Sequence, residues 1–279
     1  MTLRLGHIAY SNCLPVHASL IDGAPPPGIV VVTDVPSRLN DALARGEIDV
    51  APCSSIEYAR HDDYRILPDL TIASDGPVQS ILLESRVAPA ALDGKTVLLP
   101  TASATSVVLL RILLEVRLGV RPRYQWFDQA AHADPFAAGG DAALWIGDVA
   151  LRRSLAAGRS RLDLGEAWTE WTGLPFAFAV WQTRAPARRD AELRLLHRTL
   201  LASRQFFQTN AAAIAERQAS RFGLPPDRLL RYWHTLRYSL DARVEQGLLR
   251  FYELALRLGE ARPVAGLRYV PAESDARSA

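Results

Sequence analysis

The sequence predicts an α/β protein with two lobes and a helical C-terminal part. Strand and helix patterns alternate in two successive series along the 279 residues, and only helical patterns occur beyond Asp190. Short polar loops follow several of the predicted strands. Repeated βα units imply parallel strands with right-handed crossovers, and open parallel sheets bind ligands beyond the carboxyl ends of their strands.

The first series begins at the N-terminus. Apolar and β-branched runs predict buried strands at Leu3–Ala9, Gly28–Thr33 and Ile48–Ala51. Helical patterns follow at Pro36–Ala44, where a proline occupies the first turn, and at Ser54–Arg60. Each strand is therefore paired with a helix that follows it along the chain.

The second series leads into the C-terminal helices. Further strand patterns lie at Leu70–Ala73, Val78–Leu83, Lys95–Leu99, Tyr124–Phe127, Asp141–Ile146 and Phe176–Trp181. Helical patterns lie at Thr105–Leu118, Asp148–Ala156, Ala191–Arg221, Pro226–Thr235 and Ala242–Gly259. We expect the chain to cross between lobes near residues 85–89 and 181–186. Residues 1–87 and 183–279 then form lobe 1, and residues 88–182 form lobe 2.

Composition and charge exclude several classes of protein. The formal charge is +2, and the basic residues, all arginine except Lys95, are spread along the chain. A nucleic-acid reader would show a concentrated basic face. The N-terminus lacks a secretory signal pattern, and no apolar run is long enough to span a bilayer. Two cysteines are too few for a disulfide framework. We therefore expect a cytoplasmic protein with reduced thiols and no membrane or nucleic-acid partner; a homodimer is possible.

A cluster of hydroxyl side chains marks one predicted binding loop. Residues 100–106 (PTASATS) follow a strand and precede a helix, where free backbone N–H groups favour an anion. Thr and Ser are also ordinary N-cap residues. The hydroxyls outnumber what one cap needs, so Thr105 and Ser106 are predicted to bind an anionic group.

Other polar loops have a functional and a structural interpretation. Ser54 and Glu57 match a capping box, which leaves Ser55 to face the cleft. Asn12 either caps the first helix or points into the cleft. The motif Asp75-Gly76-Pro77 is typical of a turn.

Two more candidate binding or catalytic positions lie on a predicted strand or directly after one. Ser80 lies on the strand that leads towards the second lobe. Gly147 and Asp148 stand at a strand end, where Asp148 is a helix cap or a ligand partner.

Several chemistries lack their motifs. The sequence contains no dinucleotide fingerprint, Walker loop, zinc-protease motif or nucleophile elbow. The six histidines are scattered without metal-ligand spacing. The aromatic residues of the C-terminal helices, Tyr232 and Trp233 among them, are interpreted as helix core. No metal or cofactor is therefore expected.

The motifs together resemble a known family. They are His7–Pro15 (HIAYSNCLP), Gly46–Pro52 (GEIDVAP), Ser55–Ala59 (SIEYA), Ser74–Ser80 (SDGPVQS), Thr105-Ser106, Ile146–Asp148 (IGD) and Trp171–Trp181 (WTGLPFAFAVW). This set resembles the chorismate dehydratase family of the futalosine pathway of menaquinone biosynthesis, over about Arg4 to Trp181. A sister family, which makes dihydroxynaphthoate later in the pathway, opens with a different loop.

The resemblance implies a fold, an activity and site residues. The fold would be of the periplasmic-binding-protein type (type II), with the ligand cleft between the lobes. The activity would be dehydration of chorismate to 3-[(1-carboxyvinyl)oxy]benzoate without a cofactor. Asn12 and Ser80 would be catalytic. The loop residues Ser55, Asp75, Gly76, Thr105, Ser106, Gly147 and Asp148 would bind substrate. A non-catalytic binding or sensor protein for a small carboxylate, and the sister synthase, remain the alternatives.

Overall fold

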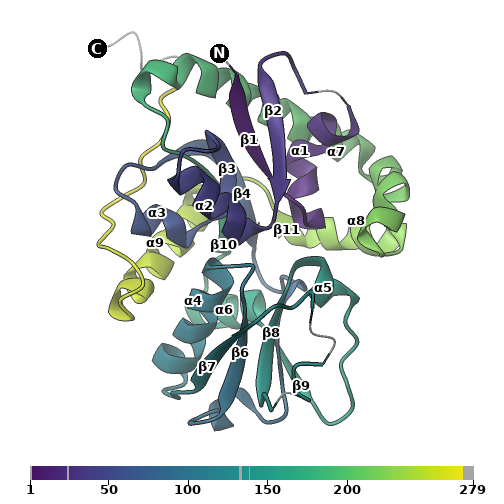
Figure 1. Cartoon of the computed structure of the whole chain (residues 1–279), viewed down its shortest axis with the longest axis vertical. Helices are drawn as coiled ribbons and strands as arrows, with labels where there is room; N and C mark the ends of the chain where they lie inside the picture. The colour runs from purple at the N-terminus through teal and green to yellow at the C-terminus, as the bar shows by residue number, and fades with distance from the viewer. Residues whose placement is uncertain (1, 24, 132–133, 138, 273–279) are drawn as a thin grey trace.

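Two β-sheets lie one beyond the other along the long axis of the molecule, and helices cover both (Figure 1). The computed structural model describes residues 2–23, 25–131, 134–137 and 139–272. We call the six-stranded sheet and its helices the first lobe, and the five-stranded sheet and its helices the second lobe.

The first sheet has the strand order β11-β4-β10-β3-β1-β2. Its strands are β1 (Leu3–Ile8), β2 (Ile29–Asp34), β3 (Val50–Ser54), β4 (Arg65–Ser74), β10 (Phe176–Thr183) and β11 (Leu236–Arg237). β1 pairs in parallel with β2 and β3, as the βα pattern predicts. β10 instead runs antiparallel to both of its neighbours, β3 and β4, because the chain returns to this sheet from the second lobe.

The second sheet has the order β7-β6-β8-β5-β9. Its strands are β5 (Ile81–Ser85), β6 (Thr96–Pro100), β7 (Arg123–Phe127), β8 (Ala142–Ile146) and β9 (Ser160–Asp163). β6 is parallel to β7 and β8, whereas β5 is antiparallel to β8 and β9. The short strands β9 and β11 were not expected, since neither has a long apolar run.

Most predicted helices are confirmed, with small shifts at their ends. They are α1 (Leu14–Asp22), α2 (Pro36–Ala44), α3 (Ile56–Arg60), α4 (Thr105–Arg111), α5 (Gly147–Arg152), α6 (Leu164–Thr172), α7 (Asp190–Phe222), α8 (Pro226–Thr235) and α9 (Ala242–Arg257). A π-helical segment (Ile112–Arg117) extends α4, and a single 3₁₀ turn, η1 (Ser11–Cys13), precedes α1. α6 was not expected; Asp163 caps it by accepting the N–H groups of Gly165 and Glu166.

The sheets place the crossings between lobes earlier than the expected positions. β5 belongs to the second sheet and β10 to the first, whereas the expected boundaries at 87 and 182 assigned all of β5 and most of β10 to the other lobe. We infer that the chain crosses between β4 and β5 and again between β9 and β10. Both crossings therefore pass close to the predicted motif Ser74–Ser80.

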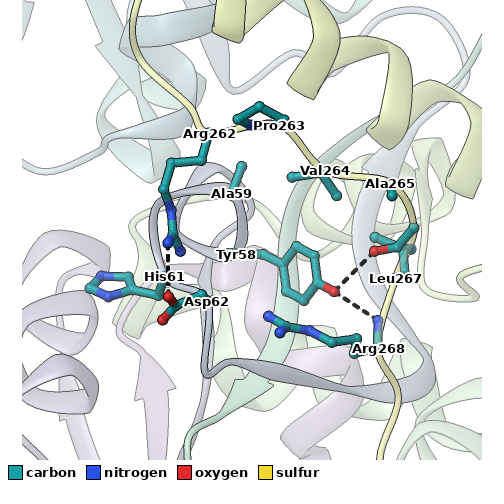
Figure 2. Close-up of a pocket in the computed structure, with 11 residues that line it drawn as sticks. Tyr58, Ala59, His61, Asp62, Arg262, Pro263, Val264, Ala265, Leu267 and Arg268 are labelled. Carbon is teal, nitrogen blue, oxygen red and sulfur yellow. Dashed lines mark hydrogen bonds and ion pairs between the residues drawn. The ribbon is translucent and has the colours of Figure 1, made fainter.

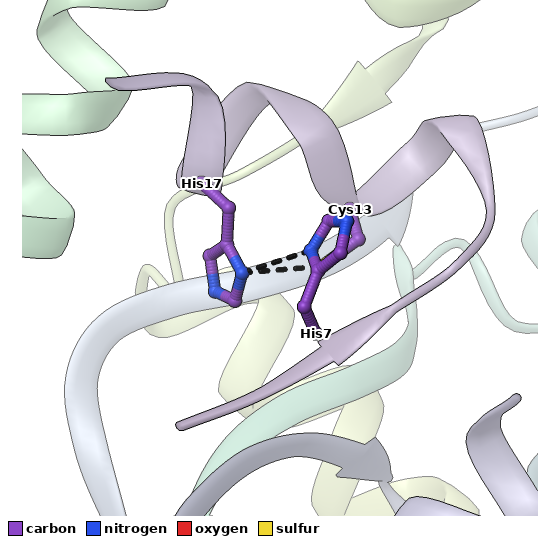
Figure 3. A group of neighbouring side chains, drawn as sticks. All are labelled: His7, Cys13 and His17. Carbon is purple, nitrogen blue, oxygen red and sulfur yellow. Dashed lines mark hydrogen bonds between the residues drawn. The ribbon is translucent and has the colours of Figure 1, made fainter. Parts of the chain in front are cut away.

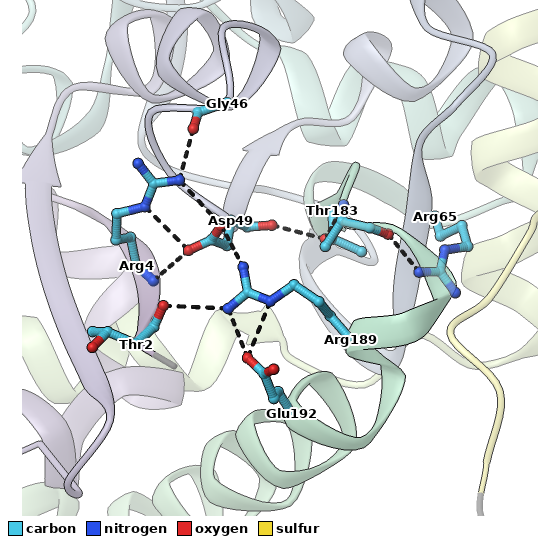
Figure 4. Close-up of polar contacts among 9 residues, drawn as sticks. Thr2, Arg4, Gly46, Asp49, Arg65, Thr183, Arg189 and Glu192 are labelled. Carbon is cyan, nitrogen blue, oxygen red and sulfur yellow. Dashed lines mark hydrogen bonds and ion pairs between the residues drawn. The ribbon is translucent and has the colours of Figure 1, made fainter.

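An ion-pair network secures the end of the first sheet that lies far from the second lobe (Figure 4). The Asp49 carboxylate accepts from Arg4 at 3.2 Å and from Arg189 at 2.8 Å, and Arg189 also pairs with Glu192 at 2.7 Å. Burial alone would raise the pKa of Asp49, but the hydrogen bonds and charges of the two arginines hold it below its usual value. The network therefore ties β1 and the residue preceding β3 to the start of α7.

A surface hollow beside α3 is lined by the C-terminal segment (Figure 2). The Tyr58 hydroxyl donates to the Gly266 carbonyl oxygen at 3.2 Å and accepts from the Arg268 N–H at 2.7 Å. Arg262 pairs with Asp62 at 3.1 Å. These contacts fasten the last described segment onto α3.

In the described part of the chain, no helix is both long and apolar enough to cross a bilayer. Cys13 and Cys53 are free and buried.

The packing of α9 onto the first sheet gives a prediction. A Cβ at Gly247 would lie 2.0 Å from the backbone carbonyl oxygen of Pro175, whereas a Cβ at Gly266 would meet nothing within 4 Å. Gly247→Ala should therefore lower the free energy of unfolding by about 3 kcal/mol or more, and Gly266→Ala by less than about 0.5 kcal/mol. Urea denaturation measures both. Equal stability of the two variants would contradict this packing.

Candidate active site

A cleft lies between the two lobes, near the ends of β1, β3 and β8. It is lined by Ile8, Tyr10, Asn12, Pro36, Ser54, Ile72, Ile81, Ser103, Ser106, Ile146, Gly147, Phe178 and Ala179. Among these lining residues there is no acid, histidine, lysine or arginine. The polar side chains that the cleft offers are therefore neutral: two aromatic or amide groups and three serine hydroxyls.

Hydrogen bonds from two other parts of the chain fix the loop after β1 at Ser11. Ser11 donates its backbone N–H to the Asp148 carboxylate at 3.1 Å, and its hydroxyl donates to the same carboxylate. The indole N–H of Trp233, on α8, donates to the Ser11 carbonyl oxygen at 2.9 Å. Asn12, the next residue, is thereby fixed at the edge of the cleft.

The Asp148 carboxylate therefore links the two lobes through its hydrogen bonds with Ser11. Its side chain is 7% exposed and stands in the first turn of α5. Burial raises the pKa of Asp148, although the hydrogen bonds from Ser11 and the charges of Arg152 and Arg221 act in the opposite direction. Both of its oxygens contact Ser11, whereas its neighbour Gly147 lines the cleft.

Asn12 and Ser80 meet at a third residue. The Tyr232 hydroxyl donates to Ser80 Oγ at 2.8 Å, and the Asn12 side chain lies close to the same Tyr232 hydroxyl. Asn12 Oδ1 is buried and has no hydrogen-bond partner among the described residues. The two residues predicted to be catalytic are thus brought together, although they come from different lobes.

The position of Ser80 is set by the crossing segment before it. The N–H groups of Val78 and Gln79 donate to Asp163 at 3.0 and 2.6 Å. Gln79 has a φ of 62°, a left-handed conformation that is uncommon for a residue with a side chain. The Ser80 carbonyl oxygen accepts from the Gly147 N–H at 2.8 Å. Ser80 is therefore anchored to both β8 and β9.

The ring of Tyr10 leaves no room for a side chain at position 147, which is a glycine. Its φ is +62°, and an added Cβ would lie 2.8 Å from the Tyr10 ring. The Tyr10 hydroxyl accepts from Gln129 at 3.4 Å, and Gln129 in turn bonds to the backbone of Ile146. Burial, followed by the charge of Asp148, raises the pKa of Tyr10 to about 12. Tyr10 is therefore a neutral wall of the cleft near pH 7.

The hydroxyl loop before α4 divides into two pairs. Ser103 donates to Ser106 at 3.1 Å, and both line the cleft. Thr105 instead lies 3.3 Å from the Ser55 hydroxyl and accepts the Ile56 N–H at 3.2 Å. Ser55 also donates to the Ala177 carbonyl oxygen. Of the predicted binding hydroxyls, Ser106 reaches the cleft, whereas Thr105 and Ser55 bond to each other across the lobes.

Asp75 and Gly76 lie away from the cleft. The Asp75 carboxylate pairs with Arg237 at 3.3 Å and with Arg243 at 3.1 Å on a partly exposed surface. The Gly76 N–H donates to the Thr169 hydroxyl at 3.0 Å, and its φ is +113°. Both residues therefore shape the crossing turn, which agrees with the structural interpretation of this motif.

Two of the histidines, expected to be scattered, are close together beneath the loop. His7, Cys13 and His17 place one potential ligand atom each within 4.8 Å of one another (Figure 3). The Trp181 indole N–H donates to His17 Nε2 at 3.0 Å, so neutral His17 carries its proton on Nδ1 and donates to His7 Nδ1 at 3.0 Å. A metal ion would have to displace that proton. The three residues thus fit a buried hydrogen-bond network better than a metal site.

Three residues of the site were not expected from the sequence. Tyr10 and Ser103 lie inside motifs that were recognised, next to residues that were chosen, so the sequence carried a signal for them. Tyr232 carried none, because a tyrosine in an apolar helical pattern is typical of core. His132 lies outside the described residues.

The fold matches those of solved structures that include a periplasmic binding protein. A protein from Archaeoglobus fulgidus superposes with a TM-score of 0.78 at 22% identity, over 92% of this chain and 98% of that one. The periplasmic aliphatic sulphonate binding protein from Escherichia coli superposes with a TM-score of 0.66 at 16% identity, over 98% and 95%. The predicted periplasmic-binding-protein type of fold is confirmed.

Sequence comparison places the chain more narrowly. A chorismate dehydratase from Thermus thermophilus is 32% identical over 267 residues, which cover 89% of this chain and 93% of that protein. The family model described as menaquinone biosynthesis matches residues 3–257, which include the cleft loops and all the residues that meet at Tyr232. The chain therefore belongs to the menaquinone biosynthesis family.

Proposed function

We propose that the protein is a hydro-lyase that converts chorismate to 3-[(1-carboxyvinyl)oxy]benzoate in menaquinone biosynthesis, at the first step of the futalosine route. The family membership and the chorismate dehydratase relative support this activity. The observation that carries it is a cleft of neutral donors that Asn12 lines, with Asn12 and Ser80 both beside the Tyr232 hydroxyl.

The reaction removes water from a ring that is one step from aromatic. The C3–H bond breaks, its electron pair completes the aromatic ring, and the C4–O bond breaks with loss of the hydroxyl group. The proton and the hydroxide together give one molecule of water. The enzyme must therefore hold two carboxylates, stabilise charge that moves towards one of them, and assist the departing hydroxyl.

The residues that line the cleft limit which group can remove the C3 proton. None of them is an acid or a histidine, and the raised pKa of Tyr10 keeps its phenol protonated near pH 7. Asp148, the carboxylate nearest in sequence to the lining, already accepts two groups of Ser11. In our proposal the enolpyruvyl carboxylate of the substrate removes the C3 proton. Alignment of a reacting group within one molecule is worth on the order of 7–11 kcal/mol.

The protein then supplies geometry and hydrogen-bond donors. In our proposal Ser103, Ser106 and the start of α4 bind one carboxylate, since both serines line the cleft and hydroxyls and backbone N–H groups at a helix start bind anions. In our proposal Asn12, which lines the cleft, and Ser80, which is buried beside it, act on the reacting side of the ring. Neutral donors aimed at developing charge stabilise it without the reorganisation that water would require.

The alternatives predict different outcomes in one assay. A binding or sensor protein of this fold would hold a carboxylate and leave it unchanged. The sister synthase would act on a later intermediate and leave chorismate intact. A cytoplasmic location and a homodimer stay predictions.

Purified protein incubated with chorismate should form an aromatic product, followed by ultraviolet absorbance and mass spectrometry. The activity should persist after dialysis against EDTA, because the proposed chemistry uses side chains and substrate alone. Unchanged chorismate would exclude the dehydratase. Activity lost with EDTA and restored by a divalent ion would overturn the metal-free mechanism.

Asn12→Asp tests the catalytic interpretation of the first loop. The change replaces an amide donor by a carboxylate acceptor of similar size, facing a dianion. Turnover should fall by about 100-fold or more, the usual scale for losing one donor to developing charge. If Asn12 only capped a helix, the variant would keep its activity. Ser80→Ala should lose a substantial part of turnover, and both proteins should unfold at nearly the wild-type temperature.

Ser106→Ala and Thr105→Ala separate the two hydroxyl pairs. Ser106 lines the cleft, so its loss should weaken substrate binding by about 1.5–3 kcal/mol if the bond is to a carboxylate. Thr105 bonds to Ser55 and Ile56, so its loss should act mainly on stability. Isothermal titration with the product and thermal unfolding distinguish the effects. The reverse assignment, with binding lost only in Thr105→Ala, would contradict this reading of the loop.

A further inference from the structure

Two consecutive aromatic side chains of α8 donate hydrogen bonds to Ser80 and to the residue before Asn12. Tyr232 is 1% exposed, and its hydroxyl donates to Ser80 Oγ at 2.8 Å. Trp233 donates to the carbonyl oxygen of Ser11, the residue before Asn12, at 2.9 Å. The ring of Phe207, on α7, packs edge-on against Trp233 with centroids 5.2 Å apart. The two donors are therefore held on a packed helix.

The hydrogen bonds around Tyr232 have a defined direction. A phenol has one proton, which Tyr232 gives to Ser80 Oγ, so towards the neighbouring Asn12 side chain the Tyr232 oxygen can act only as an acceptor. Ser80 accepts from Tyr232 and keeps its own proton for a different partner. In a series of hydrogen bonds each donor polarises the next hydroxyl, so the bond from Tyr232 strengthens the bond that Ser80 itself donates.

Burial keeps the Tyr232 hydroxyl protonated, as a hydrogen-bond donor must be. Burial raises the pKa of Tyr232 above its usual value, and the charges of Asp148 and Asp163 act in the same sense, while the bonds with Ser80 and Asn12 act against them. Tyr232 is thus a neutral donor and cannot serve as the base. Its only proton is committed to Ser80.

We propose that Tyr232 is a positioning residue, whose hydroxyl turns the Ser80 proton towards the substrate hydroxyl that leaves. This inference rests on the proposed dehydration of chorismate. Tyr232 acts through Ser80: without the bond from Tyr232, the Ser80 hydroxyl can rotate and donate elsewhere. The loss should therefore appear in turnover more than in substrate binding or stability.

Tyr232→Phe removes this one hydroxyl, and Tyr238→Phe is the matched control. The Tyr238 hydroxyl is also buried, but it has no hydrogen-bond partner among the described residues. We expect kcat of Tyr232→Phe to fall by about 10-fold to 100-fold, the effect of one oriented hydrogen bond, with KM within about threefold of wild type. Tyr238→Phe should keep wild-type kcat. Both proteins should unfold within a few degrees of wild type.

A double-mutant cycle with Ser80→Ala shows whether Tyr232 acts through Ser80. In the Ser80→Ala protein the Tyr232→Phe change should alter kcat by less than about threefold, because interacting residues are non-additive. An equal loss in both backgrounds would overturn the proposal, as would wild-type kcat in Tyr232→Phe. A loss that follows reduced folding, or one shared by Tyr238→Phe, would assign Tyr232 a structural role instead.

The wild-type reaction separates the two levels of failure. If wild-type protein leaves chorismate unchanged, the proposed function fails and the positioning role fails with it. If wild type is active and Tyr232→Phe is equally active, the positioning role alone is overturned.

Discussion

The bond between Ser11 and Asp148 is the contact on which the cleft depends. A carboxylate that is 7% exposed needs partners, because burying an unpaired charge costs several kcal/mol. Asp148 finds both partners on Ser11, in the opposite lobe. That requirement brings the start of α5 against the loop after β1, and with it Gly147 against the ring of Tyr10. Other contacts between the lobes include the Ile56 N–H with the Thr105 hydroxyl, the Tyr232 hydroxyl with Ser80, and the Arg152 guanidinium with the Phe222 carbonyl oxygen.

A neutral cleft has consequences for a charged substrate. Hydroxyl and amide groups can hold carboxylates by hydrogen bonds without adding a titratable group to the reacting site. The chemistry is then less sensitive to protonation of the protein, and the substrate's own charge is left available as a base. The buried histidines nearby do not alter this, since burial, with the charge of Arg221, lowers the pKa of His7 to about 4, and His17 bonds to Trp181.

The same fold serves binding proteins, so the difference must lie in the residues of the cleft. A binding protein needs donors that match its ligand as it stands. An enzyme needs at least one donor aimed at charge that appears only during the reaction. In our proposal the Ser80 hydroxyl is such a donor, and the Tyr232 hydroxyl that orients it comes from a distant part of the chain.

Local sequence determined the elements of the fold, and only tertiary structure decided how they meet. Pro226–Thr235 was predicted to the residue, because a proline at the first turn and an amphipathic pattern fix a helix locally. The antiparallel direction of β10 was not predicted, because the direction of a strand depends on where the chain re-enters the sheet. Motifs led to Asn12 and Ser80 as proposed catalytic residues, but they could not indicate the ion pairs of Asp75, whose partners lie more than 160 positions away. Tyr232 acts on Ser80 across 152 positions, and no local pattern encodes a contact at that range.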